Sequence, residues 1–173
     1  MRPTVGLMMI VRDEAETLPR LAGTLTGQVD HATIVDTGSV DDTVEVARRL
    51  FGHLPGQVVT QAWSDFASSR NSLLALARPQ TDWLLAMDAD ETLQGDIDRH
   101  EIHAGVDAIS VEYYTGPITY RLPRLISAGV DWRWIGRTHE HLAHPNGSGR
   151  ILQSGRWSIR HHADGGSRAG KYR

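Results

Sequence analysis

Cysteine is absent from the 173 residues, and lysine occurs once, at Lys171. Without thiols the chain has no disulfide, no thiolate nucleophile and no cysteine-ligated zinc, so a metal must be held by carboxylate, imidazole or carbonyl groups. Arginine therefore carries almost all of the positive charge. The net charge of −3 supplies no overall basic field, which argues against a nucleic-acid partner.

Long hydrophobic runs are also missing. The longest, residues 5–11, has the length of a strand, far from the roughly 20 apolar residues that span a bilayer. The first four residues lack the apolar stretch of a signal peptide. We therefore expect no transmembrane segment and a cytoplasmic location. The length fits one domain covering residues 1–173.

Strand and helix patterns alternate along the first half of the chain. A continuous apolar run, typical of a buried parallel strand, occupies residues 5–11, and further strand patterns occupy residues 32–36, 57–60 and 83–87. The first intervening helix is expected to open at residues 12–16, whose acidic side chains suit the helix dipole. Residues 41–43 should cap the second helix. Residues 66–77 show the pattern of a third helix. This alternation predicts βαβ units, whose ligands bind beyond the carboxyl ends of the strands.

After about residue 95 the pattern changes. Residues 108–114 and 118–126 alternate as strands do, and glycine and proline punctuate the remainder. The second half is expected to be a smaller β-rich portion that packs against the first.

Asp88-Ala89-Asp90 is the strongest local signal for chemistry. A buried apolar strand stops abruptly at two carboxylates, and alternate residues of an extended end point to the same side. Such a pair attracts Mg²⁺ or Mn²⁺, with phosphate oxygens completing the coordination. A solvated acidic turn, or an N-cap for a helix after Glu91, is the structural alternative. Asp13 and Asp36 also follow strand ends, so they should share a crevice with Asp88.

Several further polar residues lie where a nucleotide would bind. Asp36 can accept a hydrogen bond from a base or ribose, and Gly38 permits the close turn that follows. Arg12 and Arg70 offer guanidinium groups for phosphate or base. Each of these residues is equally compatible with ordinary turn chemistry or surface charge.

Two histidine-rich segments mark the second half. In residues 134–141, His139 and His141 would share one face of a strand with Glu140 opposite, but the spacing matches no strong zinc pattern. His161-His162 precedes Asp164 and Gly165, a second candidate ligand or phosphate contact.

In order and spacing, these motifs resemble those of the family 2 glycosyltransferases. The matching residues are 9–14, 34–43, 66–71 and 83–91, with weaker matches at 134–140 and 161–166. The resemblance implies an α/β fold of the GT-A type: a mostly parallel central sheet flanked by helices, Rossmann-like in its N-terminal half. Residues 1–95 would bind the nucleotide-sugar and residues 96–173 would form the acceptor side. Family members usually continue into further helices after the last residues here, so a short or truncated member is expected.

The resemblance also implies an activity and a site. A UDP- or GDP-linked sugar would pass to an acceptor hydroxyl with inversion, assisted by Mn²⁺ or Mg²⁺; the acceptor, whether saccharide, lipid, small molecule or protein, is left open. Glu140 would be the catalytic base, with Asp131 as the reserve. Asp88, Asp90 and His161 would hold the metal. The donor would contact Val11, Arg12, Glu14, Asp36, Gly38, Arg70, Asp88 and Ala89.

Three other classes fit parts of the pattern. A haloacid-dehalogenase-type phosphatase would use Asp88 as nucleophile, but it needs a downstream lysine and an Asp-x-Asp on its first strand. A nucleotidyltransferase would show a Gly- and Lys-rich loop after Val11, where none occurs. A non-catalytic nucleotide-sugar-binding module would keep Asp36 and have no need of Glu140.

Overall fold

The computed structural model describes residues 2–136 and 140–165. The helices are α1 (Leu18–Leu25), α2 (Thr43–Phe51), α3 (Phe66–Ala77) and the short 3₁₀ helices η1 (Arg78–Gln80) and η2 (Arg99–Glu101). The strands of the first half are β1 (Val5–Val11), β2 (His31–Asp36), β3 (Gly56–Thr60), β4 (Trp83–Ala86) and β5 (Glu91–Gln94). Those of the second half are β6 (Ala108–Thr115), β7 (Ile118–Ser127), β8 (Arg133–Ile135), β9 (His141–Ala143) and β10 (Ile151–His161).

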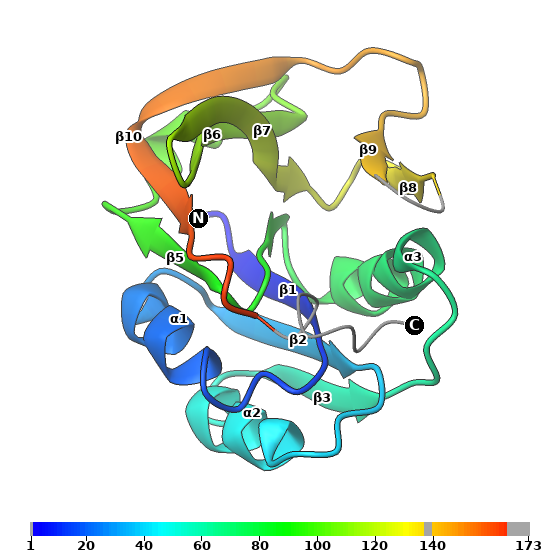
Figure 1. Cartoon of the computed structure of the whole chain (residues 1–173). Coiled ribbons are helices and arrows are strands. Elements are labelled where there is room, and N and C mark those ends of the chain that lie inside the picture. The colour runs from blue at the N-terminus through cyan, green and yellow to red at the C-terminus, as the bar shows by residue number, and fades with distance from the viewer. Residues whose placement is uncertain (1, 137–139, 166–173) are drawn as a thin grey trace.

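One eight-stranded sheet, in the order β3-β2-β1-β4-β7-β6-β10-β5, organises the described chain. The first four strands in that order are parallel, as their apolar runs predict. The second half adds β7 antiparallel to β4 and β6 antiparallel to β7, while β10 runs parallel to β6. The α/β class with a β-rich second portion is thereby confirmed. A separate ribbon of β8 and β9 lies beside α3 (Figure 1).

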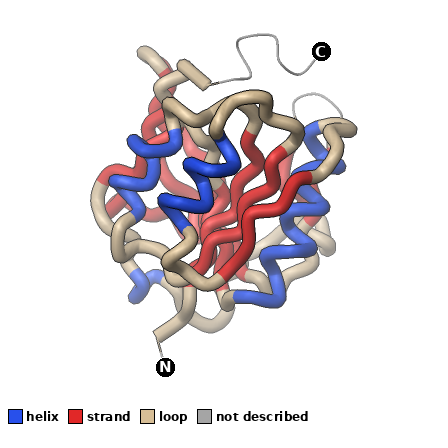
Figure 2. Tube along the Cα trace, turned by 90° about the horizontal axis from the view of Figure 1, so that it is seen from below, coloured by secondary structure: helices blue, strands red, loops and turns tan. Residues whose placement is uncertain are grey.

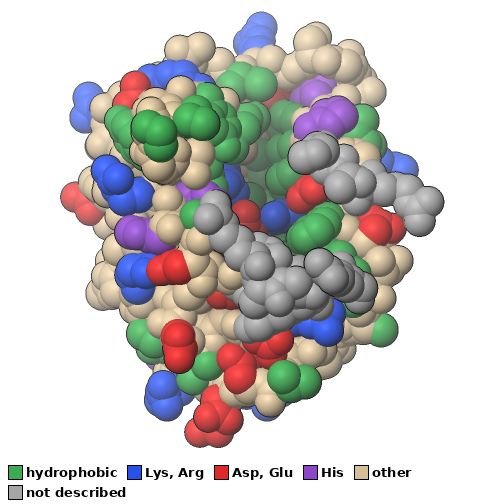
Figure 3. Space-filling model, viewed as in Figure 1, with side chains coloured by type: hydrophobic (Ala, Val, Ile, Leu, Met, Phe, Trp, Pro, Cys, Tyr) green, Lys and Arg blue, Asp and Glu red, His purple; other side chains and the backbone are tan. Residues whose placement is uncertain are grey.

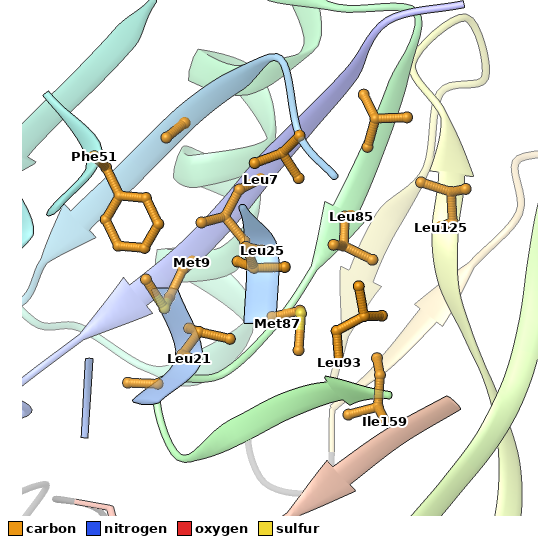
Figure 4. Close-up of a cluster of buried hydrophobic side chains, with 14 of the residues drawn as sticks. Leu7, Met9, Leu21, Leu25, Phe51, Leu85, Met87, Leu93, Leu125 and Ile159 are labelled. Carbon is orange, nitrogen blue, oxygen red and sulfur yellow. The ribbon is translucent and has the colours of Figure 1, made fainter. Parts of the chain in front are cut away.

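Helices cover both faces of the parallel strands (Figure 2). Because successive residues of a strand point to opposite faces, β1 feeds two hydrophobic clusters. Leu7 and Met9 pack with α1 and α2, as the close-up in Figure 4 shows, whereas Met8 joins the cluster of α3. These buried faces fix the strands rigidly and so fix the loops at their carboxyl ends.

The segment after β1 differs from its prediction. No helix opens at residues 12–16; α1 begins at Leu18, and its first turn contains no acidic residue. Asp13 instead adopts a positive φ of 53°, a conformation that aspartate tolerates better than most residues. The acidic residues of this segment therefore form a turn beside the sheet rather than an N-terminal helical turn.

The segment after β4 also departs from expectation. β4 ends at Ala86, and Glu91 N–H donates to the Asp88 carbonyl at 3.1 Å, which closes a turn. Residues 88–91 therefore form a turn and not an extended strand end, and β5 follows where a helix was the alternative. β5 pairs with β10 at the far edge of the curled sheet. Residues 87–90 therefore connect β4, in the middle of the sheet order, to a strand at its edge.

Gly56 is held where the backbone leaves room for no side chain. Its φ is +134°, and a Cβ would lie 1.9 Å from the carbonyl oxygen of Ala32. We expect Gly56→Ala to lower the free energy of unfolding by at least about 1–3 kcal/mol, measured by urea denaturation. Gly23→Ala is the control, since a Cβ there meets no atom within 4 Å; if both variants lose stability equally, the steric explanation fails.

None of the helices in the described ranges is long and apolar enough to cross a lipid bilayer.

Candidate active site

The turn after β2 brings two of the predicted acidic residues together. Asp36 is 2% exposed and accepts hydrogen bonds from the backbone N–H groups of Gly38 (3.1 Å) and Ser39 (3.2 Å). The Ser39 hydroxyl also donates to Asp36, and it accepts from the N–H of Asp13 at 2.8 Å. Asp13 in turn accepts from Val40 N–H at 2.7 Å. The loop of residues 37–40 is thus fastened to the carboxyl ends of β1 and β2.

Arg70, on α3, joins two carboxylates that are far apart in the sequence. Its Nη2 donates to Asp88 Oδ1 at 2.8 Å, and its Nε donates to Glu140 Oε1 at 3.0 Å. The guanidinium also lies 4.9 Å from the ring centre of Trp134, a cation–π distance. Asn71, the next residue of α3, forms hydrogen bonds with the backbone N–H and carbonyl of Trp134 and so holds β8 against the helix. One helix turn therefore sets the relative positions of Asp88 and Glu140.

The charges of this group stabilise one another. Burial alone lowers the pKa of Arg70, but Asp88 and Glu140 outweigh burial and raise it above its ordinary value. Burial likewise raises the pKa of Asp88, while the attraction of Arg70 and Arg124 holds that pKa below its usual range. Arg70 is therefore a permanent cation and Asp88 a permanent anion at neutral pH.

Asp90 contacts the end of β10 and the residues that follow it. Its Oδ2 accepts from His161 Nε2 at 3.0 Å and from Gly165 N–H at 3.2 Å. His161 Nδ1 lies 3.0 Å from the hydroxyl of Thr115. The hydrogen bond to Asp90 raises the pKa of His161, against the smaller effect of burial. The pairing of β10 with β5, which sets His161 opposite Glu91, accounts for this contact.

The chain after β10 lies over the carboxylates. His162 N–H donates to the Asp90 carbonyl at 2.9 Å, and Asp164 forms a two-pronged ion pair with Arg20 of α1 at 2.6 and 2.8 Å. A Cβ on Gly165 would come within 2.9 Å of both Asp90 and Glu14. Residues 162–165 therefore form a close cover on this side of the site.

A buried ion pair lies beneath the loop of residues 87–90. Glu91, which is 0% exposed, pairs with Arg124 of β7. Glu91 also accepts from the hydroxyl of Tyr113 at 2.7 Å and from the backbone N–H of Asp88 at 2.9 Å.

A cavity of about 270 Å³ opens beside Asp88. Its lining residues are Arg70, Asp88, Leu122, Pro123, Arg124, Trp134, Glu140, His141 and Leu142. Figure 3 shows this face hollowed, with hydrophobic side chains around the hollow and charged ones nearby. A depression of similar size between α1 and α2 has no carboxylate or arginine in its lining. The cavity at Asp88, by contrast, brings two carboxylates and two arginines together.

The remaining predicted residues divide between this site and other parts of the fold. Val11 ends β1, with its carbonyl accepting from Thr37, and Ala89 is buried in the loop of residues 87–90. Glu14 is buried near Gly165, and Arg12 belongs to the turn after β1. Asp131 lies elsewhere: it pairs with Arg78 at 2.7 Å, about two helical turns along α3 from Arg70. His139 falls outside the described residues.

Sequence reasoning missed the supporting residues Glu91, Tyr113, Thr115 and Arg124. A signal existed for Arg124, because it is a charged residue inside an otherwise apolar strand pattern, residues 122–126. Charged groups are rarely buried unless they are paired. Tyr113 and Thr115 gave no comparable signal.

The sequence is similar to a known protein family and to several curated proteins. The model of the family described as glycosyl transferase family 2 matches residues 7–162. A TPR repeat-containing protein of Synechococcus elongatus is 37% identical over 145 residues, which cover 79% of this chain and 34% of that protein. An uncharacterized glycosyltransferase of Rickettsia felis is 28% identical over 93 residues, covering 54% of this chain and 31% of the relative. The chain thus spans about a third of the length of these relatives.

Solved structures share the fold at low sequence identity. TarS of Staphylococcus aureus, solved with UDP, has a TM-score of 0.54 at 17% identity, over 65% of this chain and 37% of that chain. Glucosyl-3-phosphoglycerate synthase of Mycobacterium tuberculosis, solved with Mn²⁺ and UDP, has a TM-score of 0.51 at 17% identity, over 66% and 46%. These likenesses confirm the GT-A type of fold.

Proposed function

Since this chain belongs to glycosyl transferase family 2, we propose that it transfers a sugar from a UDP- or GDP-linked donor to an acceptor hydroxyl, with metal assistance and inversion. One observation carries the proposal. Arg70 links Asp88 to Glu140 at the carboxyl edge of the parallel strands, and the adjacent loop presents Asp90 to His161. A donor-binding carboxylate, Asp88, and a candidate base, Glu140, therefore line one cavity.

The nucleotide is proposed to bind across the carboxyl ends of β1, β2 and β4. Asp36 ends β2 and Asp88 follows the end of β4, and these two strands flank β1; ordinary strand spacing puts them about 10 Å apart, a span suited to a nucleoside diphosphate. Gly38 has a φ of +104°, and a Cβ added there would meet no atom within 4 Å, so this turn leaves open space for the donor. Because Asp36 is buried and holds the turn, its direct contact with base or ribose requires the loop of residues 37–40 to move.

Asp90 and His161 fit a divalent ion. Their Oδ2 and Nε2 atoms are 3.0 Å apart, about the separation of adjacent ligands on an octahedral ion with bonds near 2.1 Å. No group of three or more such protein ligands occurs in the described part of the chain, so donor phosphates and water would complete the coordination, as is usual for Mg²⁺. When bound, the ion would neutralise the diphosphate leaving group. Asp88, paired with Arg70, is then proposed to contact the donor.

Thr115 supports His161 from behind. A histidine that binds metal through Nε2 usually donates its Nδ1–H to a second residue, which fixes the ring. We expect Thr115→Val, which keeps the shape and removes the hydroxyl, to weaken Mn²⁺ binding by about 10–100-fold. Calorimetric titration with Mn²⁺ measures this. Unchanged Mn²⁺ affinity in the folded variant would exclude His161 as a ligand oriented in this way.

Glu140 is the proposed base. It faces the cavity, and Arg70 holds its carboxylate in one orientation. A carboxylate at this place can remove the proton of an acceptor hydroxyl while the hydroxyl oxygen attacks the sugar opposite the leaving diphosphate. Asp131, at a distance from the cavity and paired with Arg78, is not proposed for this role.

A panel of UDP- and GDP-sugars tests the proposal, with binding and donor hydrolysis measured in Mn²⁺ and in EDTA. The expected result is that one donor binds and is slowly hydrolysed only with the metal. If no nucleotide-sugar responds in either condition, the chain does not have this activity. Binding without turnover, unaltered in Glu140→Gln, would favour the non-catalytic module.

A further inference from the structure

The ion pair between Glu91 and Arg124 is deeply buried and lies beneath the loop of residues 87–90. Glu91 is 0% exposed, Arg124 is 6% exposed and Tyr113 is 5% exposed. Arg124 also lies 4.8 Å from the ring centre of Tyr113, so the three side chains form one compact unit. Burial raises the pKa of Glu91 above its ordinary value, and the attraction of Arg124 opposes that rise in part.

Two hydrogen bonds of this unit go to backbone groups at the start of the loop of residues 87–90. Glu91 Oε2 accepts the N–H of Asp88 at 2.9 Å, and Arg124 Nη1 donates to the carbonyl of Ala86 at 3.2 Å. The two backbone groups lie on either side of Met87, whose own N–H donates to the Met8 carbonyl of β1 at 3.3 Å just after β4 has ended. Tyr113 holds Glu91 from the opposite side at 2.7 Å.

Stability alone does not account for such a unit. Removing two charges from water costs more than their attraction commonly returns, and apolar replacements of similar volume are often as stable or more stable. What an ion pair supplies and an apolar cluster cannot is a directed hydrogen bond to a backbone group. Here the Glu91 carboxylate is the group that accepts the Asp88 N–H.

We propose that Glu91, Tyr113 and Arg124 are positioning residues that hold the backbone of Asp88, and with it the donor-binding carboxylate, in its working orientation. The proposal rests on the proposed function for its consequence, namely tighter donor binding. The positioning itself is independent of any donor, because it concerns the order of the loop of residues 87–90 in the free protein.

An apolar triple variant separates positioning from stability. Glu91→Leu/Tyr113→Phe/Arg124→Met removes the charges and the hydroxyl while keeping the volume close to that of the native side chains. We expect a melting temperature equal to that of the native protein or higher. Amide hydrogen exchange at Asp88, followed by NMR, should become at least about 10-fold faster, and Mn²⁺-dependent binding of the donor should weaken by about 10–100-fold.

Two further variants complete the design. Glu91→Gln, made in the native protein, retains a carbonyl oxygen for the Asp88 N–H. It should therefore keep most of the amide protection and much of the donor affinity that the triple variant loses. Arg99→Met removes a half-buried arginine that bonds Asp30, Pro3 and Gln28 at the amino end of the sheet. It should lower the melting temperature and leave donor affinity and Asp88 exchange unchanged.

The outcomes are distinct. Native Asp88 exchange and native donor affinity in the folded triple variant would overturn the proposal, as would donor affinity that simply follows melting temperature across all variants. If the triple variant does not fold, Tyr113→Phe replaces it: faster exchange at Asp88 with a native melting temperature supports positioning, and native exchange refutes it. If the native protein binds no nucleotide-sugar, the proposed function fails, while the exchange data still decide whether these residues position the loop.

Discussion

Replacing Glu140 by glutamine is expected to lower kcat for sugar transfer by about 10²–10⁴-fold, the usual contribution of a positioned general base. Glutamine has the same shape, and its carbonyl oxygen can still accept from Arg70 Nε, which is 3.0 Å from Oε1 in the native protein. It cannot take a proton from an acceptor hydroxyl. Donor affinity should therefore remain within about 3-fold of native, because the substitution removes an interaction of the transition state only.

Asp131→Asn is the matched comparison. Asp131 is also a carboxylate paired with an arginine of this helix region, Arg78, but it lies outside the cavity. Steady-state kinetics with the best donor and acceptor should give near-native values for this variant. If Asp131→Asn loses turnover and Glu140→Gln keeps it, the base has been assigned to the wrong carboxylate.

Asp90→Asn should have the largest effect on donor binding. Asp90 and His161 are the residues proposed to hold the ion, and an amide oxygen is a much weaker ligand than a carboxylate for such a cation. Because neutralising a diphosphate leaving group contributes several kcal/mol, Mn²⁺-dependent kcat/KM should fall by about 100-fold or more. In EDTA the native protein and the variant should bind the nucleotide equally weakly.

Asp96→Asn controls for the loss of one negative charge. Asp96 lies just beyond the other end of β5 and accepts a hydrogen bond from Gln28 at 2.6 Å. Calorimetric titrations with Mn²⁺ and UDP should show native behaviour for this variant. A metal requirement that persists unaltered in Asp90→Asn would remove Asp90 from the ion site.

Much of the fold was readable from local pattern. The first strand has the bounds its apolar run predicts, residues 5–11, and the next three parallel strands agree within a residue at each end. Buried parallel strands are readable because both faces demand apolar side chains. The start of α1 was placed too early, because the acidic residues that suit a helix dipole serve a turn here. The backbone N–H groups of Asp13 and Glu14 instead donate to the hydroxyls of Ser39 and Thr43, which are contacts between distant segments.

The candidate site could be predicted from the sequence only in part, because it also depends on contacts between distant segments. Strand ends predicted that Asp36 and Asp88 lie at one edge of the sheet, and the parallel pairing of β2 and β4 with β1 agrees with that placement. Asp90 pairs with His161 while Asp88 pairs with Arg70 because β5 leaves β4 and pairs with β10 at the far edge of the sheet. No local pattern encodes that pairing, so the different partners of the two carboxylates could not be foreseen. The same pairing explains why Glu91, in an acidic run of the sequence, is a buried residue and not a solvated one.

A crystal structure with Mn²⁺ and the nucleoside diphosphate of the donor found in the panel is the most direct test. We expect the diphosphate beside Asp88 and Asp90, with the ion about 2.0–2.3 Å from Asp90 and His161 and the base against the loop of residues 37–40. A nucleotide at the amino end of the sheet, or an ion bound away from Asp90, would contradict the account.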